Sequence, residues 1–280
     1  MTAQISFQVE DRIRVDIADH VADVRLIRSD KMNALDDAMF NALIATGERL
    51  KCEPGVRAVV LSGEGRAFCA GLDMGNFARM AGQGEDKGDH ASIGGARLAN
   101  RTHGRANRAQ YACLVWRDVP APVIAAIHGV ALGGGLQVAL GADVRIVAPD
   151  AKLSVLEIKW GLIPDMGGMM ILRRLLREDV FRELTFTGRM LTGEEAVQVG
   201  IATRTAADPL AEARTLAAEI AQKSPDAIRA GKRLLELAAN GTDHQILQAE
   251  SDEQDRLIGS RNQIEAVMAN LQKRSAVFVD

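Results

Sequence analysis

Two glycine-rich turns, each directly after an apolar run typical of a buried strand, constrain this sequence more than any other feature. The first turn spans residues 63–74 and the second spans residues 128–135. Glycine lets backbone N–H groups approach a ligand without a side chain in the way. Two such turns can direct two N–H groups at one carbonyl oxygen and stabilise negative charge that develops there. The pair therefore predicts enolate or tetrahedral-oxyanion chemistry on a carbonyl or thioester, with neither a metal nor a redox cofactor.

Apolar periodicity predicts strands that alternate with helices through about residue 205. Residues 13–17 alternate between apolar and polar side chains, as a half-buried strand does. A helical pattern begins at Asp36 or Asp37 and continues to Leu50. This alternation is typical of an α/β fold. Further strands are expected at residues 56–61, 122–127, 143–147 and 153–155, and a further helix at residues 134–140.

The last part of the chain has a helical pattern throughout. Pro209 and Pro225 lie near two expected helix starts, where proline is favoured. Asn240–Gly241 interrupts the helical pattern between Leu237 and His244. We therefore predict two regions, an α/β core at residues 1–205 and a helical region at residues 206–280. The helical region is apolar enough to pack on a neighbouring molecule.

Composition narrows the classes of function. The formal net charge is −3, so no basic excess exists to neutralise phosphates and we expect no nucleic-acid partner. The three cysteines are too few and too irregularly spaced for a disulfide framework or a metal site, which fits a reducing compartment. The first residues do not form a signal peptide, and no apolar run approaches the length of a membrane span. We expect a cytoplasmic protein without a membrane partner.

The two glycine turns, in this order and at this separation, resemble those of the crotonase family, the enoyl-CoA hydratases and isomerases. The resemblance extends over residues 5–280, and its joint pattern is specific although either turn alone is a weak signal. Five further segments carry it, namely residues 27–35, 156–168, 186–188, 196–202 and 277–278.

This resemblance implies a spiral of ββα units followed by a helical C-terminal trimerisation region. It also implies a homotrimer or homohexamer, an acyl-CoA thioester as the small-molecule substrate, and no further cofactor or metal. By position, the backbone N–H groups of Leu72 and Gly134 match the oxyanion hole. An alternative is that residues 133–135 only permit tight packing of a helix on a strand. The positions that match substrate and CoA contacts are Lys31, Met32, Ala34, Ala70, Asp73, Met74 and Gly133.

Glu157 matches the second catalytic glutamate of the family. A carboxylate beside a thioester can move a proton at a carbon of the acyl chain if burial raises its pKa toward neutrality. The alternative is a solvated loop glutamate.

The chain departs from the hydratase pattern at two of its predicted catalytic positions. Typical hydratases carry a glutamate where this chain has Gln137, and glutamine cannot accept a proton as a carboxylate does. Many hydratases carry glycine where this chain has Asp165, a position that is aspartate in the dienoyl-CoA isomerases. Those isomerases also carry aspartate at the position of Gln137, so the match is incomplete. An alternative for Asp165 is that it caps the helix that continues to Leu176.

Three classes of function remain open at this point. The first is an enoyl-CoA hydratase (a lyase) or an enoyl- or dienoyl-CoA isomerase that acts through Glu157 and Asp165. The second is a thioester hydrolase or another lyase on the same fold, because an oxyanion hole also serves a tetrahedral intermediate. The third is a non-catalytic acyl-CoA-binding protein, which the loss of the first glutamate motivates.

Several polar residues have two interpretations. Residues 81–90 are expected to form a surface loop, and four arginines follow it at helical spacing. They form either a solvated helix face or an acyl-binding lid that contacts phosphates. Arg28 and Lys31 are either CoA phosphate contacts or solvated loop residues. Cys69 is interpreted as a small buried side chain. The four arginines are Arg97, Arg101, Arg105 and Arg108.

Overall fold

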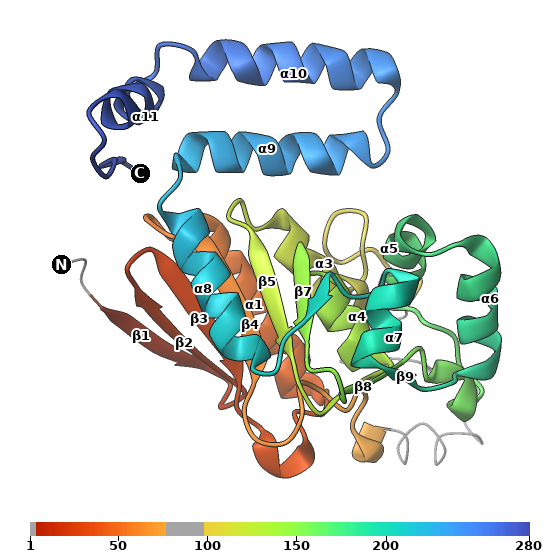
Figure 1. Ribbon diagram of the computed structural model, residues 1–280. Coiled ribbons are helices and arrows are strands. Elements are labelled where there is room, and N and C mark those ends of the chain that lie inside the picture. The colour runs from red at the N-terminus through yellow and green to blue at the C-terminus, as the bar shows by residue number, and fades with distance from the viewer. Residues whose placement is uncertain (1–3, 77–97) are drawn as a thin grey trace.

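The computed structural model describes residues 4–76 and 98–280 of the chain (Figure 1). The surface loop predicted at residues 81–90 and the side chain of Arg97 lie outside these described residues. Among the described helices, none has both the length and the apolar character that a bilayer span requires.

A seven-stranded sheet in the order β1-β2-β3-β4-β5-β7-β10 forms the centre of the molecule. Its first three strands pair antiparallel, and β3, β4, β5, β7 and β10 pair parallel. The predicted α/β class is confirmed, and the predicted strands appear within two residues of their expected bounds. The strands are β1 (Ile5–Val9), β2 (Ile13–Ala18), β3 (Val21–Leu26), β4 (Ala58–Gly63), β5 (Val123–Ile127), β7 (Val144–Val147) and β10 (Arg204–Thr205).

Helices cover both faces of this sheet (Figure 1). On one face, α1 (Asp37–Cys52) and α3 (Arg108–Asp118) pack over Val59 and Leu61 in the larger apolar core. On the other face, the alanines of α8 (Pro209–Ala221) pack over Ala58 and Val60. Strands buried on both faces have continuous apolar sequences, which explains the run that precedes the first glycine turn.

A second, three-stranded sheet carries the elements around the second glycine turn. It consists of β6 (Val130–Leu132), β8 (Lys152–Ser154) and β9 (Leu191–Thr192). Single bridges extend its pairing to the first turn, because Cys69 pairs with Ala131 and Leu35 pairs with Leu72. The short helices beside it are α4 (Gly134–Leu140), α5 (Gly168–Leu175), α6 (Glu178–Thr187), α7 (Gly193–Val199) and the 3₁₀ helix η2 (Glu157–Trp160). Another 3₁₀ helix, η1 (Ser29–Lys31), lies beside the first turn, where a Cβ on Gly65 would be 2.7 Å from Ser29 Cβ.

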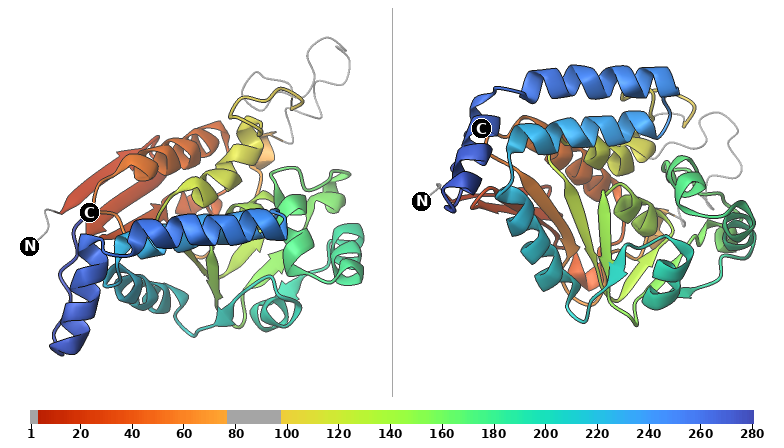
Figure 2. Two further views of the ribbon diagram at one scale, coloured as in Figure 1. Left: turned by 90° about the horizontal axis from the view of Figure 1, so that it is seen from above. Right: turned by 45° about the horizontal axis from the view of Figure 1, so that its top comes forward.

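The C-terminal helices α9 (Pro225–Ala238) and α10 (Asp243–Leu257) form an antiparallel pair beyond one end of the sheet, and α11 (Arg261–Leu271) follows (Figures 1 and 2). Both prolines begin helices, and the predicted interruption at Asn240–Gly241 separates α9 from α10. The predicted boundary at residue 205 places α8 in the helical region, yet α8 packs on the sheet. The buried ammonium of Lys232 anchors α9 to the core through Asp143 and the carbonyls of Trp116 and Ala121.

The prediction that four arginines share one helix is wrong for those that the structure describes. Asn107 and Gln110 form a capping box that begins α3 at Arg108, so Arg101 and Arg105 precede the helix. Arg101 donates to Gln110 and to nearby carbonyls, and Arg108 donates to Asn41 on α1. These arginines therefore do not form a common helix face.

Candidate active site

The first turn is paired in a way that leaves one backbone N–H free. Leu35 N donates to Gly71 O over 2.8 Å, and Asp73 N donates to Leu35 O over 3.0 Å. In such parallel pairing the residue between the two bonded ones directs its own N–H and C=O to the other side. That residue is Leu72, and among the described residues its N–H has no hydrogen-bond acceptor.

The second turn exposes the first N–H of a helix. Gly133 N donates to Ser154 O over 2.9 Å, which joins the turn to β8. Gly133 has φ 49° and ψ −119°, a conformation that glycine adopts far more readily than other residues. Gly134 then begins α4, and the first N–H groups of a helix have no intrahelical acceptor. Within the described part of the chain, Gly134 N–H has no acceptor of another kind.

The two turns lie in direct contact. Gly71 has φ 88°, and a Cβ at this position would lie 2.5 Å from Leu132 O and 3.7 Å from Gly134 N. Neither the conformation nor the space admits a side chain, so glycine is required here. This contact brings the free N–H groups of Leu72 and Gly134 to neighbouring positions.

Glu157 lies beside the second turn on the one-turn helix η2. Its Oε1 accepts a 2.6 Å hydrogen bond from Gln137 Nε2, and its Oε2 is buried with no hydrogen-bond partner among the described residues. A Cβ on Gly133 would lie 3.4 Å from Glu157 Oε1, so the carboxylate contacts the turn itself. The solvated-loop alternative is therefore wrong.

The pKa of Glu157 lies above its ordinary value, chiefly because burial removes water from the carboxylate. The negative charge of Asp165 raises this pKa further, while hydrogen bonds from the Glu157 backbone and from Gln137 oppose the rise. A carboxyl group whose pKa moves toward neutrality can both accept and release a proton near neutral pH.

Asp165 is half-buried in the segment that leads to α5. Burial raises its pKa, and a hydrogen bond from its own backbone opposes the rise only in part. The capping alternative is wrong, because α5 begins after Gly167 and no side chain caps it. Gly167 has φ 93°, so the chain enters the helix from a left-handed conformation that leaves Asp165 outside the cap position.

Gln137 is only 2 % exposed and lies on α4, with its amide between Glu157 and the segment that carries Asp165. Its Oε1 accepts hydrogen bonds of 2.9 Å from both Met166 N and Gly168 N. The structure therefore brings together the three residues that the sequence predicted as catalytic. Of these, Gln137 carries an amide, which cannot accept a proton as a carboxylate does.

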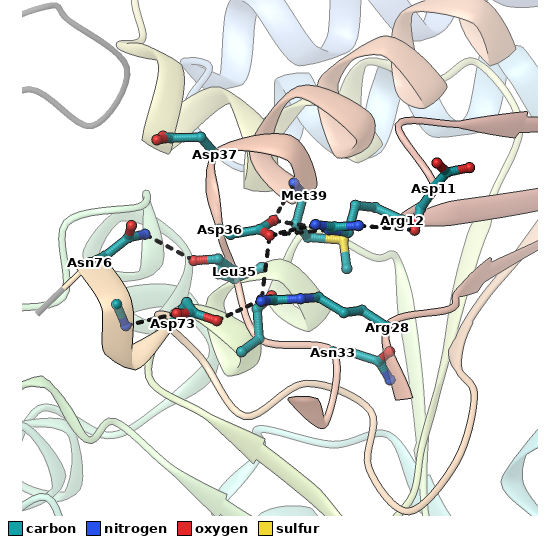
Figure 3. A network of polar contacts seen from close by, with 12 residues as sticks. Asp11, Arg12, Arg28, Asn33, Leu35, Asp36, Asp37, Met39, Asp73 and Asn76 are labelled. Atoms are coloured by element: carbon teal, nitrogen blue, oxygen red, sulfur yellow. Dashed lines mark hydrogen bonds and ion pairs between the residues drawn. The ribbon is translucent and has the colours of Figure 1, made fainter. Parts of the chain in front are cut away.

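Charged residues brace the first turn from the outside (Figure 3). Arg28 forms ion pairs with Asp73 at 2.6 Å and with Asp36 at 3.5 Å, and Arg12 pairs with Asp36 at 2.8 Å. Arg28 also donates to Ala34 O. Its guanidinium thus joins the segment that follows β3 to the start of α1 and to the first turn. Nothing in the local sequence pattern indicates this network, because Arg28 and Asp73 are far apart in the chain.

The carboxylates of this network are stabilised in their charged form. Burial alone would raise the pKa of Asp73, but hydrogen bonds from Gly75 N and from Arg28 outweigh it and the net pKa is lowered. Burial of Asp36 is likewise outweighed by Arg12, by Met39 N and by Arg28, so its pKa is also lowered. Both groups remain ionised well into the acid range.

The predicted substrate-contacting positions lie on both sides of the first turn and at the second turn. Lys31 and Met74 are exposed, whereas Ala34 is buried and Ala70 N donates to Met32 O. The side chain of Asp73 is already bound by Arg28 and by Gly75 N. Contacts of these positions with CoA remain predictions.

The buried thiols support a structural interpretation. Cys69 Sγ donates to Asn33 O and Cys113 Sγ donates to Gln137 O, and burial raises the pKa of each thiol to about 12. A thiol with this pKa is almost entirely protonated at neutral pH and is a poor nucleophile. The interpretation of Cys69 as a small buried side chain is confirmed.

Two neighbouring backbone donors beside a buried carboxylate, carried by a parallel sheet with helices on both faces, define an enzyme of the crotonase fold. The profile of the enoyl-CoA hydratase/isomerase family matches residues 16–280. The chain therefore belongs to this family.

Relatives of both reaction types are similar to this chain. A probable enoyl-CoA hydratase of Bacillus subtilis (strain 168) is 32% identical over 266 residues, which cover 93% of this chain and 96% of the relative. The mitochondrial Delta(3,5)-Delta(2,4)-dienoyl-CoA isomerase of Mus musculus is 31% identical over 259 residues, which cover 91% and 77%. Among solved structures, an enoyl-CoA hydratase from Bacillus anthracis has a TM-score of 0.82 and 29% identity, over 96% of this chain and 99% of that one.

Proposed function

We propose that this enzyme shifts a double bond within an unsaturated acyl-CoA thioester, with Glu157 and Asp165 as its two proton carriers. The observation that carries the proposal is the free, buried Oε2 of Glu157 beside an amide that cannot act as a base. Similarity to the dienoyl-CoA isomerases supports the same reaction.

The reaction begins when Glu157 removes a proton from the carbon next to the thioester carbonyl. The resulting enolate oxygen is stabilised by hydrogen bonds from Leu72 N–H and Gly134 N–H, which are stronger to the anion than to the neutral carbonyl. Asp165 in its acid form then donates a proton to a carbon further along the chain. One proton leaves and one enters, so the double-bond system moves toward the thioester and no other atom is gained or lost.

Hydration is the second candidate, and the named enoyl-CoA hydratases among the relatives favour it. The two-glutamate route would need a base at position 137. Gln137 Oε1 already accepts two backbone hydrogen bonds, which occupy both lone pairs, so it has no site left to orient an attacking water. Hydration would therefore depend on Glu157 and Asp165 alone.

The test incubates the protein with crotonyl-CoA, 3-enoyl-CoA and 3,5-dienoyl-CoA in deuterated water and follows each by mass spectrometry. We expect a product with a shifted double bond and no added water. Addition of one water would instead establish hydration. Release of free CoA would establish thioester hydrolysis, and binding without turnover of the three substrates would establish a binding protein.

The residue assignment is tested by Glu157→Gln and Asp165→Asn. We expect Glu157→Gln to lower turnover by about 10²–10⁴-fold, as loss of a general base does. Glu178→Gln, at an exposed position on α6, is the matched control and should retain full activity. Near-normal turnover of Glu157→Gln would contradict the assignment.

We also propose a homotrimer or homohexamer, with a C-terminal trimerisation region at residues 206–280, as the family resemblance implies. Large apolar side chains remain exposed on the last helices and in the segments that follow them, and they support a further contact. Light scattering of the purified protein measures the mass directly. A cytoplasmic location and independence from cofactors remain predictions of the sequence. The exposed side chains are Leu235, Leu247, Ile258, Ile264, Val267, Met268, Leu271 and Val277.

A further inference from the structure

We infer that Gln137 is a positioning residue whose side-chain amide holds Glu157 and the segment that carries Asp165 in one fixed arrangement. The inference rests on the proposed function, because it assigns the geometry on which the proton transfer depends. It starts from three hydrogen bonds made by a single amide, namely Nε2 to Glu157 and Oε1 to Met166 N and Gly168 N.

The orientation of this amide follows from its partners. Two backbone N–H groups meet one end of it, and an N–H can only donate, so that end must be the carbonyl oxygen. The other end is then the NH₂ group, and it faces Glu157 Oε1 at 2.6 Å. The partners on both sides therefore select the same orientation, and a flipped amide would place donor against donor.

The amide joins three segments through side-chain hydrogen bonds. It projects from α4, holds the carboxylate on η2, and binds the residues on either side of Gly167. The Gln137 amide is packed tightly against the backbone of Gly168, because a Cβ on Gly168 would lie 2.7 Å from Gln137 Oε1. Asp165 immediately precedes Met166, so the position of its backbone is set by the same contact.

The hydrogen bond to Glu157 Oε1 also determines which carboxylate oxygen is free to accept the substrate proton. With Oε1 engaged, Oε2 is left as the oxygen that is free to take a proton. The N–H donor favours the charged form of Glu157, whereas burial and the charge of Asp165 favour the neutral form. Among the described residues, Asp165 is the titratable group whose charge acts on Glu157.

Glutamine suits this position because its terminal group offers an acceptor and a donor at once. A glutamate keeps the acceptor for Met166 N and Gly168 N but places an oxygen against Glu157 Oε1. A methionine of similar length removes both arms. Comparison of Gln137→Glu with Gln137→Met therefore separates the effect of the hydrogen bonds to Met166 N and Gly168 N from the effect of the hydrogen bond to Glu157.

The first measurement needs no substrate. Backbone hydrogen exchange of the peptide that contains Met166 and Gly168 should become faster in Gln137→Met and remain close to the parent in Gln137→Glu. The control is Cys113→Ala, which loses a buried contact with the Gln137 backbone but leaves the amide intact. We expect it to leave this exchange unchanged.

The second measurement is the pH profile of kcat and KM with 3,5-dienoyl-CoA. Both Gln137 variants lose the N–H that donates to Glu157 and stabilises its charged form, so the pKa of Glu157 should rise. The part of the kcat profile in which activity increases as Glu157 loses its proton should therefore move to higher pH in both variants. We expect kcat to fall by roughly 10- to 100-fold with a much smaller change in KM, because the reacting groups lose alignment. Cys113→Ala should keep the parent profile.

The inference is overturned if Gln137→Met keeps the parent exchange rates, or if its pH profile and kcat equal those of the parent. It is also overturned if only KM changes, because that result would indicate a substrate contact and not positioning. An active Glu157→Gln enzyme would overturn the proposed function, whereas the exchange result would still decide whether Gln137 holds the segment.

Discussion

The two glycine turns supply the same kind of backbone donor, and both are held by backbone contacts, but the first turn is also held by ion pairs. The first turn is braced by charge, since Asp73 is bound by Arg28, which also pairs with Asp36. The second turn is held by backbone contacts, such as the bond from Gly133 N to Ser154 O. A Cβ on Gly135 would lie 2.3 Å from Cys69 O, so the backbones of the two turns are in contact with no room for a side chain between them.

This difference separates two ways to fix a donor. A contact between backbone atoms does not depend on pH or salt, and it fails only when added volume moves the chain. Ion pairs depend on the charge state of their partners, and the loss of one partner leaves a desolvated charge behind. We therefore expect added volume to disturb the contact between the turns from either side, at Gly71 or at Gly135, and loss of charge to disturb the first turn.

The largest effect is expected from Gly135→Ala, which tests the volume sensitivity. The new methyl group would meet the carbonyl and Cβ of Cys69, so the turns must separate and both donors shift. We expect a loss of activity above about 100-fold and a loss of stability of about 1–3 kcal/mol. Activity assays and urea unfolding measure the two effects.

The matched control is Gly231→Ala on α9, where a Cβ would meet nothing within 4 Å. An alanine in a helix stabilises it by roughly 0.5–1 kcal/mol relative to glycine, so this variant should be slightly more stable and fully active. Equal behaviour of the two variants would refute the steric account of the second turn.

The next largest effect is expected from Arg28→Met, which tests the charge sensitivity. The side chain keeps its apolar stem but leaves Asp73 and Asp36 without the shared cation. Because the Arg28 side chain is 16% exposed and that of Asp73 is 18% exposed, we expect a cost of about 3 kcal/mol. Arg14→Met breaks the more exposed pair with Glu64 and should cost less than about 1 kcal/mol. A smaller loss in Arg28→Met than in Arg14→Met would show that the network does not brace the turn.

A third effect concerns pH. The pKa values of Asp73 and Asp36 are lowered in the folded protein, so their stabilisation is present above the ordinary carboxyl pKa and is lost as pH falls through the lowered values. Asp73→Asn should therefore differ most from the parent in urea unfolding near pH 7. The difference should shrink as pH falls below the ordinary carboxyl pKa of about 4, because the unfolded chain then takes up a proton that the folded Asp73 resists. A difference that stays constant over this range would mean that Asp73 acts through its shape alone.

The smallest effect is expected from Met74→Ala, at the rim of the first turn. Met74 is 63% exposed, so its removal should change the free energy of unfolding by less than about 0.5 kcal/mol. If the position contacts CoA as predicted, KM rises while kcat is unchanged. An unchanged KM would remove Met74 from the substrate-contacting set.

The elements that surround the site could be predicted where a local pattern determines them. The helix at residues 134–140 has its predicted bounds, because a glycine triplet after a strand opens an apolar helical run. Asp36 caps α1 through Met39 N, as a residue of this type before a helical pattern does. The strands β1, β6, β9 and β10 were not predicted, and the last three of these have only two or three residues, which are too few to show a period.

The contacts that hold the site could not be predicted from local pattern. Arg28 and Asp73 meet only because β3 and the first turn lie on neighbouring parts of the sheet. The interpretation of Asp165 as a cap failed because the left-handed Gly167 moves the helix start two residues along. The role inferred for Gln137 depends on three partners from distant segments, and spacing alone identified the position without its contacts.

The bridges between Leu35 and Leu72 and between Cys69 and Ala131 bear on how the enzyme matures. Each joins segments that are distant in the chain, so a long loop must close before the pairing forms. Chains rich in such contacts fold slowly compared with helical bundles. Helices can therefore form early after dilution from denaturant while the two donors are still apart. Recovery of turnover should follow the last phase of refolding, which makes catalysis a sensitive report of the completed native state.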